Sequence, residues 1–304
     1  MKLIVQPDDG MAPLLAAIRH ARKSVDIMVF RFDRSDLRHA LAEAVRRGVA
    51  VRTLIAHTNS EGPRSLRKLE LDLLAAGITV SRTADDLVRY HAKFFVVDRV
   101  RAFILAFNFT ALDINKSRSF AVEVRTRRIV QELLTLFDAD AGRQPYKPGV
   151  ADLLVSPLNA RDRLAAFIRA ARRQLFIYDP KLSDPKMLAL IRERVRAGVD
   201  VRVIGHVAKP GATITSAPLD GRRLHARAMI ADGRRAFIGS QSLKGLELDK
   251  RREVGLIIRD RAIVRQMESV FAEDWARSGK AANSKAGEGE KPAIVREVRE
   301  LQGT

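Results

Sequence analysis

Two short stretches of the sequence carry the same side chains that could act on a phosphate group. Each contains a His, a cationic side chain two residues later and an Asp five residues after the cation: His91, Lys93 and Asp98 in the first stretch, and His225, Arg227 and Asp232 in the second. An imidazole that titrates near neutral pH can serve as nucleophile, base or acid. Fixed cations can neutralise charge on the nonbridging oxygens of a phosphate. Two imidazoles and two cations in one pocket would suit cleavage of a phosphodiester, with no need for a metal ion or another cofactor.

Both stretches belong to an internal repeat, which is the clearest organisational feature of the sequence. Residues 45–52 return in similar form as residues 195–202, 150 positions later. Further along, the separation is 134 positions, because residues 101–104 return unchanged as residues 235–238. The repeat divides the chain into an N-terminal half, a C-terminal half and a tail: residues 1–148, 149–278 and 279–304.

Hydrophobic periodicity alternates between helical and strand-like spacing within each half. Residues 37–47 and 187–197 have helical spacing, and each is followed by a Gly and an apolar strand. Downstream, residues 93–107 and 227–238 each predict two strands joined by a turn. Since residues i and i+2 of a strand face the same side, each His is expected to project beside its cation. The predicted fold class is α/β: a duplicated α/β/α sandwich with two mixed β-sheets, flanked by helices and related by a pseudo-twofold axis.

The composition limits the possible partners and the cellular compartment of the protein. Lys and Arg number 55 against 36 acidic residues, a net charge of +19, which favours an anionic partner: nucleic acid, an anionic membrane surface or a phosphorylated small molecule. The absence of Cys excludes a disulfide framework and a thiolate metal site. No apolar stretch reaches the roughly 20 residues that cross a bilayer, and the first residues lack a signal-peptide pattern, so a cytoplasmic location is expected, with peripheral membrane association left open. Residues 279–291 predict a flexible linker, and residues 293–301 either a short helix or a frayed end.

The two stretches resemble the H-x-K-x4-D-x6-G-S-x-N signature of the phospholipase D superfamily, and with the repeat the resemblance covers residues 1–278. The first copy ends in Leu-Ala-Phe-Asn, so it keeps Asn108 but has Ala106 in place of Ser. The second copy has Arg in place of Lys and ends in Gly-Ser-Gln-Ser. The resemblance implies that the ends of both motifs share the binding of the phosphate oxygens: Asn108, Ser240, Gln241 and Ser242. The departures leave reduced or lost activity open as an alternative.

The resemblance also implies a mechanism that uses one His from each half. One His attacks phosphorus and forms a covalent phosphohistidine, while the other protonates the leaving alkoxide. Lys93 and Arg227 would hold the nonbridging oxygens, although Arg is not a neutral replacement for Lys. Asp98 and Asp232 fall at strand turns, where we expect them either to support the residues of the site or to hold the turns, rather than to carry protons.

An acidic residue beyond each motif assigns the roles of the two His residues. In related enzymes such a residue orients the His of the other half. Glu253 occupies this position after the second motif, whereas its equivalent after the first motif is Ser119. We therefore predict that Glu253 supports His91 as the nucleophile and that His225 is the general acid. The opposite assignment would follow if Glu123 supported His225.

The resemblance implies an enzyme of the phospholipase D and cardiolipin synthase-like group, which hydrolyses or transfers a phospholipid head group. A phospholipid or another phosphodiester is the expected substrate. Two alternatives remain: a nuclease of the same superfamily acting on DNA or RNA, and a degenerate, non-catalytic binder of anionic polymers. Ala106, Arg227 and Ser242 are the residues that favour the second alternative. Because both halves lie in one chain, a monomer is expected to assemble the complete site, and no oligomer is required.

Overall fold

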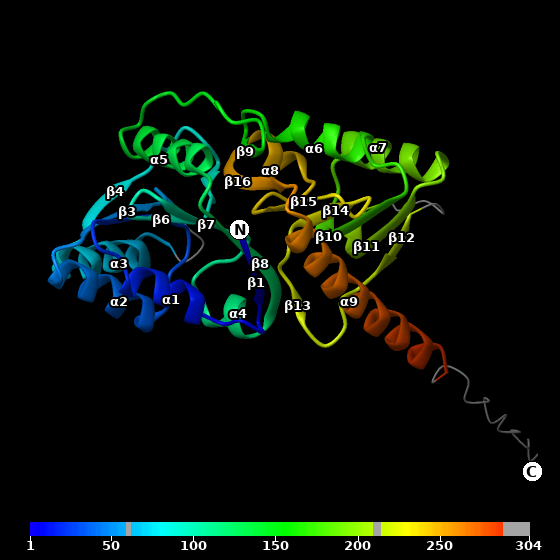
Figure 1. Ribbon diagram of the computed structural model, residues 1–304, viewed down its shortest axis with the longest axis horizontal. Coiled ribbons are helices and arrows are strands. Elements are labelled where there is room, and N and C mark those ends of the chain that lie inside the picture. The colour runs from blue at the N-terminus through cyan, green and yellow to red at the C-terminus, as the bar shows by residue number, and fades with distance from the viewer. Residues whose placement is uncertain (59–61, 209–213, 288–304) are drawn as a thin grey trace, which may run out of the picture.

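The computed structural model describes residues 1–58, 62–208 and 214–287, with side chains up to residue 278. In this part of the chain the strands form two eight-stranded sheets, and helices cover both faces of each sheet (Figure 1). The predicted fold class, a duplicated α/β/α sandwich, is confirmed. No helix within the described ranges is long and apolar enough to cross a membrane.

The first half of the chain builds one mixed sheet with helices on both faces. Its elements are β1 (Lys2–Gln6), α1 (Ala12–Arg19), β2 (Ser24–Val29), α2 (Ser35–Arg46), β3 (Ala50–Ile55), α3 (Pro63–Ala75), β4 (Thr79–Arg82), β5 (Arg89–Tyr90), β6 (Phe94–Val97), β7 (Arg101–Leu105), α4 (Ala111–Asn115), β8 (Ser117–Val124) and α5 (Arg127–Ala141). The strand order is β1-β8-β7-β6-β2-β3-β4, in which β2, β3 and β4 run parallel to one another.

The second half repeats this arrangement. Its elements are β9 (Leu153–Ser156), α6 (Ala160–Arg169), β10 (Gln174–Leu182), α7 (Pro185–Arg196), β11 (Asp200–Val207), β12 (Thr215–Ala217), β13 (Arg223–Leu224), β14 (Ala228–Ala231), β15 (Arg235–Gly239), α8 (Gly245–Asp249), β16 (Arg251–Ile258) and α9 (Arg261–Gly287). The strand order is β12-β11-β10-β14-β15-β16-β5, with β9 also paired to β16.

Both sheets share one central core. The faces toward α5 and α9 bury a continuous apolar cluster, to which Phe94 and Phe120 belong in the first half and Ile238 and Leu256 in the second. The opposite faces pack under α1, α2 and α3 in the first half and under α6 and α7 in the second (Figure 1). Because apolar burial dominates folding, the shared cluster holds the two halves together as one unit.

Each half lends a two-residue strand to the sheet of the other half. The strand β5 pairs in parallel with β16, and β13 pairs in parallel with β8. The chain therefore passes from one sheet to the other directly after β5 and again directly after β13. These crossovers contain residues 91–93 and 225–227, so both His-x-cation motifs lie at the seam between the sheets.

Two crossed ion pairs also join the halves at this seam. Arg118 on β8 forms a bidentate pair with Asp274 on α9, with N···O distances of 2.8 and 3.1 Å. Arg252 on β16 pairs in the same way with Asp140 on α5, with both distances 3.1 Å. All four side chains are at least nine-tenths buried. Bidentate geometry compensates the cost of taking such charges out of water only while both partners are present.

The structure corrects several boundaries. Residues 91–93 lie just outside β6, and β7 ends at Leu105 rather than at residue 107. The repeat separation shortens because the described residues between β11 and β14 contain no counterpart of α3. Helix α9 continues to Gly287, so the first part of the predicted linker at 279–291 is helical, which its Ala and Lys residues favour. Residues 288–304, including the predicted helix at 293–301, lie outside the described residues.

The crossed ion pairs predict a large effect of removing one partner. Asp274→Ala leaves Arg118 buried with fewer anionic partners and removes the acceptor of the Tyr178 hydroxyl. We expect the free energy of unfolding to fall by about 3 to 5 kcal/mol, measured by urea denaturation. Asp152→Ala is the control, because Asp152 pairs with Arg259 at an exposed site and should change the free energy by about 1 kcal/mol or less. Equal effects of the two substitutions would contradict the role given to the buried pair.

Candidate active site

Both candidate His residues lie at crossovers between the sheets rather than within a strand. The backbone N–H of His91 donates to the carbonyl of Arg252 at 2.8 Å, and that of His225 donates to the carbonyl of Arg118 at 3.1 Å. These bonds fix the start of each motif against a strand that belongs to the other half. The expected proximity of each His to its cation is present, although the sequence placed the pairs on strands.

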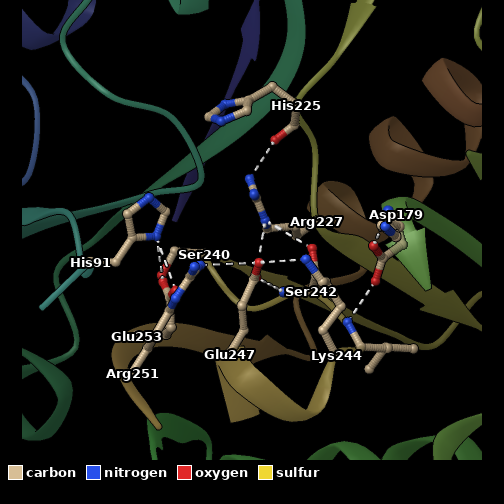
Figure 2. A network of polar contacts seen from close by, with 12 residues as sticks. His91, Asp179, His225, Arg227, Ser240, Ser242, Lys244, Glu247, Arg251 and Glu253 are labelled. Carbon is tan, nitrogen blue, oxygen red and sulfur yellow. Dashed lines mark hydrogen bonds and ion pairs between the residues drawn. The ribbon is translucent and has the colours of Figure 1, made fainter. Parts of the chain in front are cut away.

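A carboxylate of the other half holds the ring of His91. Nδ1 lies 2.9 Å from Oε2 of Glu253, whose side chain is fully buried on β16 (Figure 2). Lys93 donates from Nζ to the carbonyl oxygen of His91 at 2.7 Å and lies 2.9 Å from both ring nitrogens. Phe30 packs edge-on against the imidazole, with centroids 4.6 Å apart. Because Nδ1 faces the carboxylate, Nε2 is the ring nitrogen that could meet a substrate, and Lys93 lies beside it.

His225 is held differently. The position equivalent to Glu253 is Ser119, whose hydroxyl donates to the carbonyl oxygen of His225 at 3.5 Å. Nδ1 of His225 has no hydrogen-bond partner among the described residues, but Oδ2 of Asp113 lies 3.5 Å away. Glu123 pairs with Arg101 instead, at 2.8 Å. Glu123 therefore does not support His225, which was the condition for assigning His225 as the nucleophile.

Arg227 is fixed by the residues around it. Its Nη1 donates to the carbonyl of His225 and its Nε to the hydroxyl of Ser242, both at 3.2 Å (Figure 2). Glu247 on α8 lies 3.7 Å from Nε and accepts the backbone N–H of Ser242 at 2.7 Å. Glu247 and Asp113 are equivalent acidic residues that the sequence analysis missed. Their separation of 134 positions, the spacing of the repeat, was the signal that could have found them.

The residues expected to bind phosphate oxygens do not all face the site. Asn108 donates from Nδ2 to Asp113 at 2.7 Å, and its buried Oδ1 has no partner within the described chain. Ser240 accepts the backbone N–H of Val254 on β16 at 3.2 Å and donates to the carbonyl of the same residue at 3.4 Å. Gln241 turns away and donates to a backbone carbonyl of β9 at 3.3 Å, because glycines on β15 and β16 leave room for its amide there. The phosphate contact of Gln241 stays a prediction, and in this structure its amide is directed away from the two His residues.

The motif residues Asp98 and Asp232 lie away from the two His residues, at the far ends of β6 and β14. Both adopt positive φ, at 52° and 56°, in the hairpin turns. Oδ1 of Asp98 accepts the backbone N–H of Lys23 at 2.6 Å, and Oδ1 of Asp232 accepts that of Arg173 at 2.7 Å. Each carboxylate thus ties a hairpin to the start of a neighbouring strand, as expected for turn residues. Neither belongs among the residues that would touch a substrate.

Burial and nearby cations change the protonation of the site. The pKa of His91 lies well below 6.5 because of lost hydration and then the charge of Lys93. Lost hydration and Arg227 lower the pKa of His225 in the same way, and Asp113 opposes this effect. Burial lowers the pKa of Lys93 to about 7. The direction of both shifts favours neutral imidazoles at pH 7 in the free protein. A bound phosphodiester anion would raise the pKa of His225 and favour its protonation.

Comparison with known proteins gives one family match and several matches to solved structures. A family model described as "Cardiolipin synthase, PLD-like domain" matches residues 14–141 and 164–275. No curated protein sequence matches the chain. The polyphosphate kinase of Porphyromonas gingivalis superposes with a TM-score of 0.74 and 18% identity over 89% of this chain, which spans about half (49%) of that protein. The phosphatidylserine synthase of Haemophilus influenzae Rd KW20 gives 0.67 and 11% over 88% of this chain and 84% of that one. Both structures show a shared fold.

The charge of Lys93 predicts a measurable change in the titration of His91. Lys93→Met removes the second-largest cause of the low pKa, so we expect the midpoint of His91 to move upward toward 6.5. Ring NMR signals of the six His residues would follow the titration, with the His91 signal assigned from His91→Gln. Lys68→Met, on the exposed face of α3, is the control that should leave the midpoint unchanged. A midpoint unaffected by Lys93→Met would contradict the contribution of the Lys93 charge to the low pKa of His91.

Proposed function

Because the chain belongs to the phospholipase D-like family, we propose that it cleaves a phosphodiester through a covalent phosphohistidine. His91 is the proposed nucleophile and His225 the proposed general acid. The observation that carries this proposal is the contact of 2.9 Å between Glu253 and Nδ1 of His91 across the seam. A carboxylate at Nδ1 directs Nε2 toward the substrate and stabilises the charge that the ring acquires on attack.

The proposed reaction has two displacements at phosphorus. In the first, Nε2 of His91 forms the P–N bond as the P–O bond to the leaving group breaks, and His225 gives its proton to the departing oxygen. Lys93 and Arg227 hold the nonbridging oxygens. In the second, neutral His225 takes a proton from water as the water oxygen attacks phosphorus and the P–N bond breaks. An alcohol in place of water would complete a transfer reaction.

Asp113 is proposed to take over the supporting role that Ser119 cannot fill. Its carboxylate lies 3.5 Å from Nδ1 of His225 and favours the protonated form of that ring. Asp113 is itself fixed, since it accepts from the backbone N–H of Asn108 at 2.9 Å and from Arg223 at 2.6 Å. A proton on His225 is needed only when the leaving group departs, so a looser carboxylate contact suits a general acid.

A phospholipid head-group diester is the proposed substrate, with a nuclease activity as the second candidate. The family model, described as a cardiolipin synthase domain, supports the lipid proposal, and the net charge of +19 supports nucleic acid. The non-catalytic alternative rested on Ala106, Arg227 and Ser242. Arg227 and Ser242 are hydrogen-bonded to each other beside His225, which supports a working site rather than a degenerate one.

The first experiment is turnover of bis(p-nitrophenyl) phosphate by the wild type, His91→Ala and His225→Ala in the presence of a chelator. We expect activity that resists the chelator and falls by at least about a thousandfold in both variants. Trapping of labelled phosphate should mark the wild type but not His91→Ala. Label retained on His91→Ala would reverse the two roles, and an inert wild type would favour the non-catalytic binder.

The role of Asp113 predicts a change in the pH profile. Because the carboxylate raises the pKa of His225, Asp113→Asn should lower it, and the alkaline limb of kcat should move to lower pH. We expect kcat to fall by about tenfold or more at pH 7 while KM changes little. Glu123→Gln is the matched control and should leave the profile unchanged, because Glu123 pairs with Arg101. A uniform loss of activity without a shift of the limb would indicate that Asp113 acts only on the fold.

A further inference from the structure

Two arginines lie directly opposite each other beside the candidate nucleophile. In the parallel pairing of β5 with β16, Arg89 is in register with Arg251. Like charges in directly opposed positions of a sheet destabilise it. In the equivalent pairing of β13 with β8, Arg223 is in register with Ser117 and donates to its hydroxyl at 2.9 Å. The pairing of β5 with β16, next to His91, thus carries one more cation than the pairing of β13 with β8.

Strand geometry puts both arginines on the face of the seam that holds the reacting groups. Side chains at i and i+2 of an extended chain share a face, which groups Arg89 with His91 and Arg251 with Glu253. The intervening residues point to the other face, where the Arg252 guanidinium lies 5.5 Å from the ring centroid of Tyr90. Arg89 therefore lies one pleat, about 7 Å, from His91 along the chain.

The anionic partners of these arginines are too few to neutralise them. Arg251 is 14% exposed and reaches Glu247 at 3.3 Å, but Glu247 also lies 3.7 Å from Arg227. Arg89 has no carboxylate within 4.0 Å among the residues that the structure describes, and its guanidinium stacks 5.1 Å from the ring centroid of Phe30. The buried Nε atoms of both Arg89 and Arg251 lack hydrogen-bond partners within the same ranges.

The equivalent arginine of the other seam shows the contrast. Arg223 donates to Asp113 at 2.6 Å, so its charge is paired. Burial and the charge of Arg251 instead lower the pKa of Arg89. A cavity of about 190 Å³ adjoins Arg89 and is also lined by His57, Thr58 and the exposed Asp85. An anion next to Arg89 and Arg251 would relieve their repulsion and provide acceptors for their free N–H groups.

We propose that Arg89 and Arg251 form a second anion subsite beside the pocket for the scissile phosphate. It takes a phosphate that is joined by a short linker to the scissile diester, so the substrate is a bisphosphorylated or polyphosphorylated ester. This proposal rests on the proposed function, since it takes His91 as the position of the scissile phosphate. The planar fork of Arg matches two oxygens of a phosphate, which a lone zwitterionic head group would not supply at this second position.

The test compares two ligands that differ by one phosphate, thymidine 5′-monophosphate and thymidine 3′,5′-bisphosphate, by titration calorimetry at constant ionic strength. We expect the wild type to bind the bisphosphate at least about tenfold more tightly. In Arg89→Gln the two affinities should agree within about twofold, and Arg89→Lys should retain part of the difference. Thermal unfolding of each variant would check that it folds.

Arg125→Gln is the matched control for the loss of one positive charge. Arg125 is 70% exposed and pairs with Glu123, so its substitution should leave the affinity ratio of the wild type unchanged. Two results would overturn the subsite: equal affinities for the two ligands in the wild type, or a ratio that persists in Arg89→Gln.

The binding ratio also separates the subsite from the proposed function, because it needs no turnover. A wild type that cleaves the chromogenic diester but binds both ligands equally would contradict the subsite alone. An inert wild type whose ratio is lost in Arg89→Gln would contradict the phosphodiesterase and support the subsite. The variant Arg89→Gln also distinguishes the sources of the second phosphate. Weaker binding of oligothymidylate than in the wild type indicates a polynucleotide, and weaker binding of cardiolipin micelles indicates a lipid.

Discussion

The candidate site depends on two arginines that join the halves at the seam. The side chain of Arg252 pairs with Asp140, and its backbone carbonyl accepts the N–H of His91. In the same way, the side chain of Arg118 pairs with Asp274, and its backbone carbonyl accepts the N–H of His225. The residue that follows each arginine on its strand then faces the His that the arginine holds. The same two arginines thus join the halves and hold the backbone of each His, which keeps the imidazoles in a fixed geometry.

Duplication gives the two halves one scaffold, and divergence at a few positions where the sheets meet gives the two His residues different neighbours. Glu253 follows Arg252, whereas Ser119 follows Arg118 at the equivalent position of the first half. Two positions before the His, Arg89 lies opposite an arginine, whereas its equivalent Arg223 lies opposite Ser117. His91 therefore has a buried carboxylate at Nδ1 and extra positive charge beside it. These differences support the proposed roles of His91 as nucleophile and His225 as general acid.

The sequence predicted much of this arrangement because the repeat compares the chain with itself. It located both motifs, and the resemblance to the phospholipase D superfamily pointed to Glu253 as the partner of His91. It could not predict that β5 and β13 pair with the other sheet, because a two-residue strand has no periodicity and its partner is set by tertiary packing. The direction of Gln241 was equally hidden, since space beside two glycines decides it.

The electrostatics of the seam fit the proposed pairing of a nucleophile with a general acid. Burial, Lys93 and Arg227 lower the pKa of both imidazoles, which favours their neutral forms and keeps the lone pair that the proposed attack by His91 requires. In the proposed mechanism a phosphodiester cancels part of that positive charge as it binds, and His225 then gains a proton beside Asp113. Substrate binding would thus create the general acid while Glu253 holds His91 for attack. A site with permanently protonated imidazoles would bind the anion strongly but would lack a nucleophile.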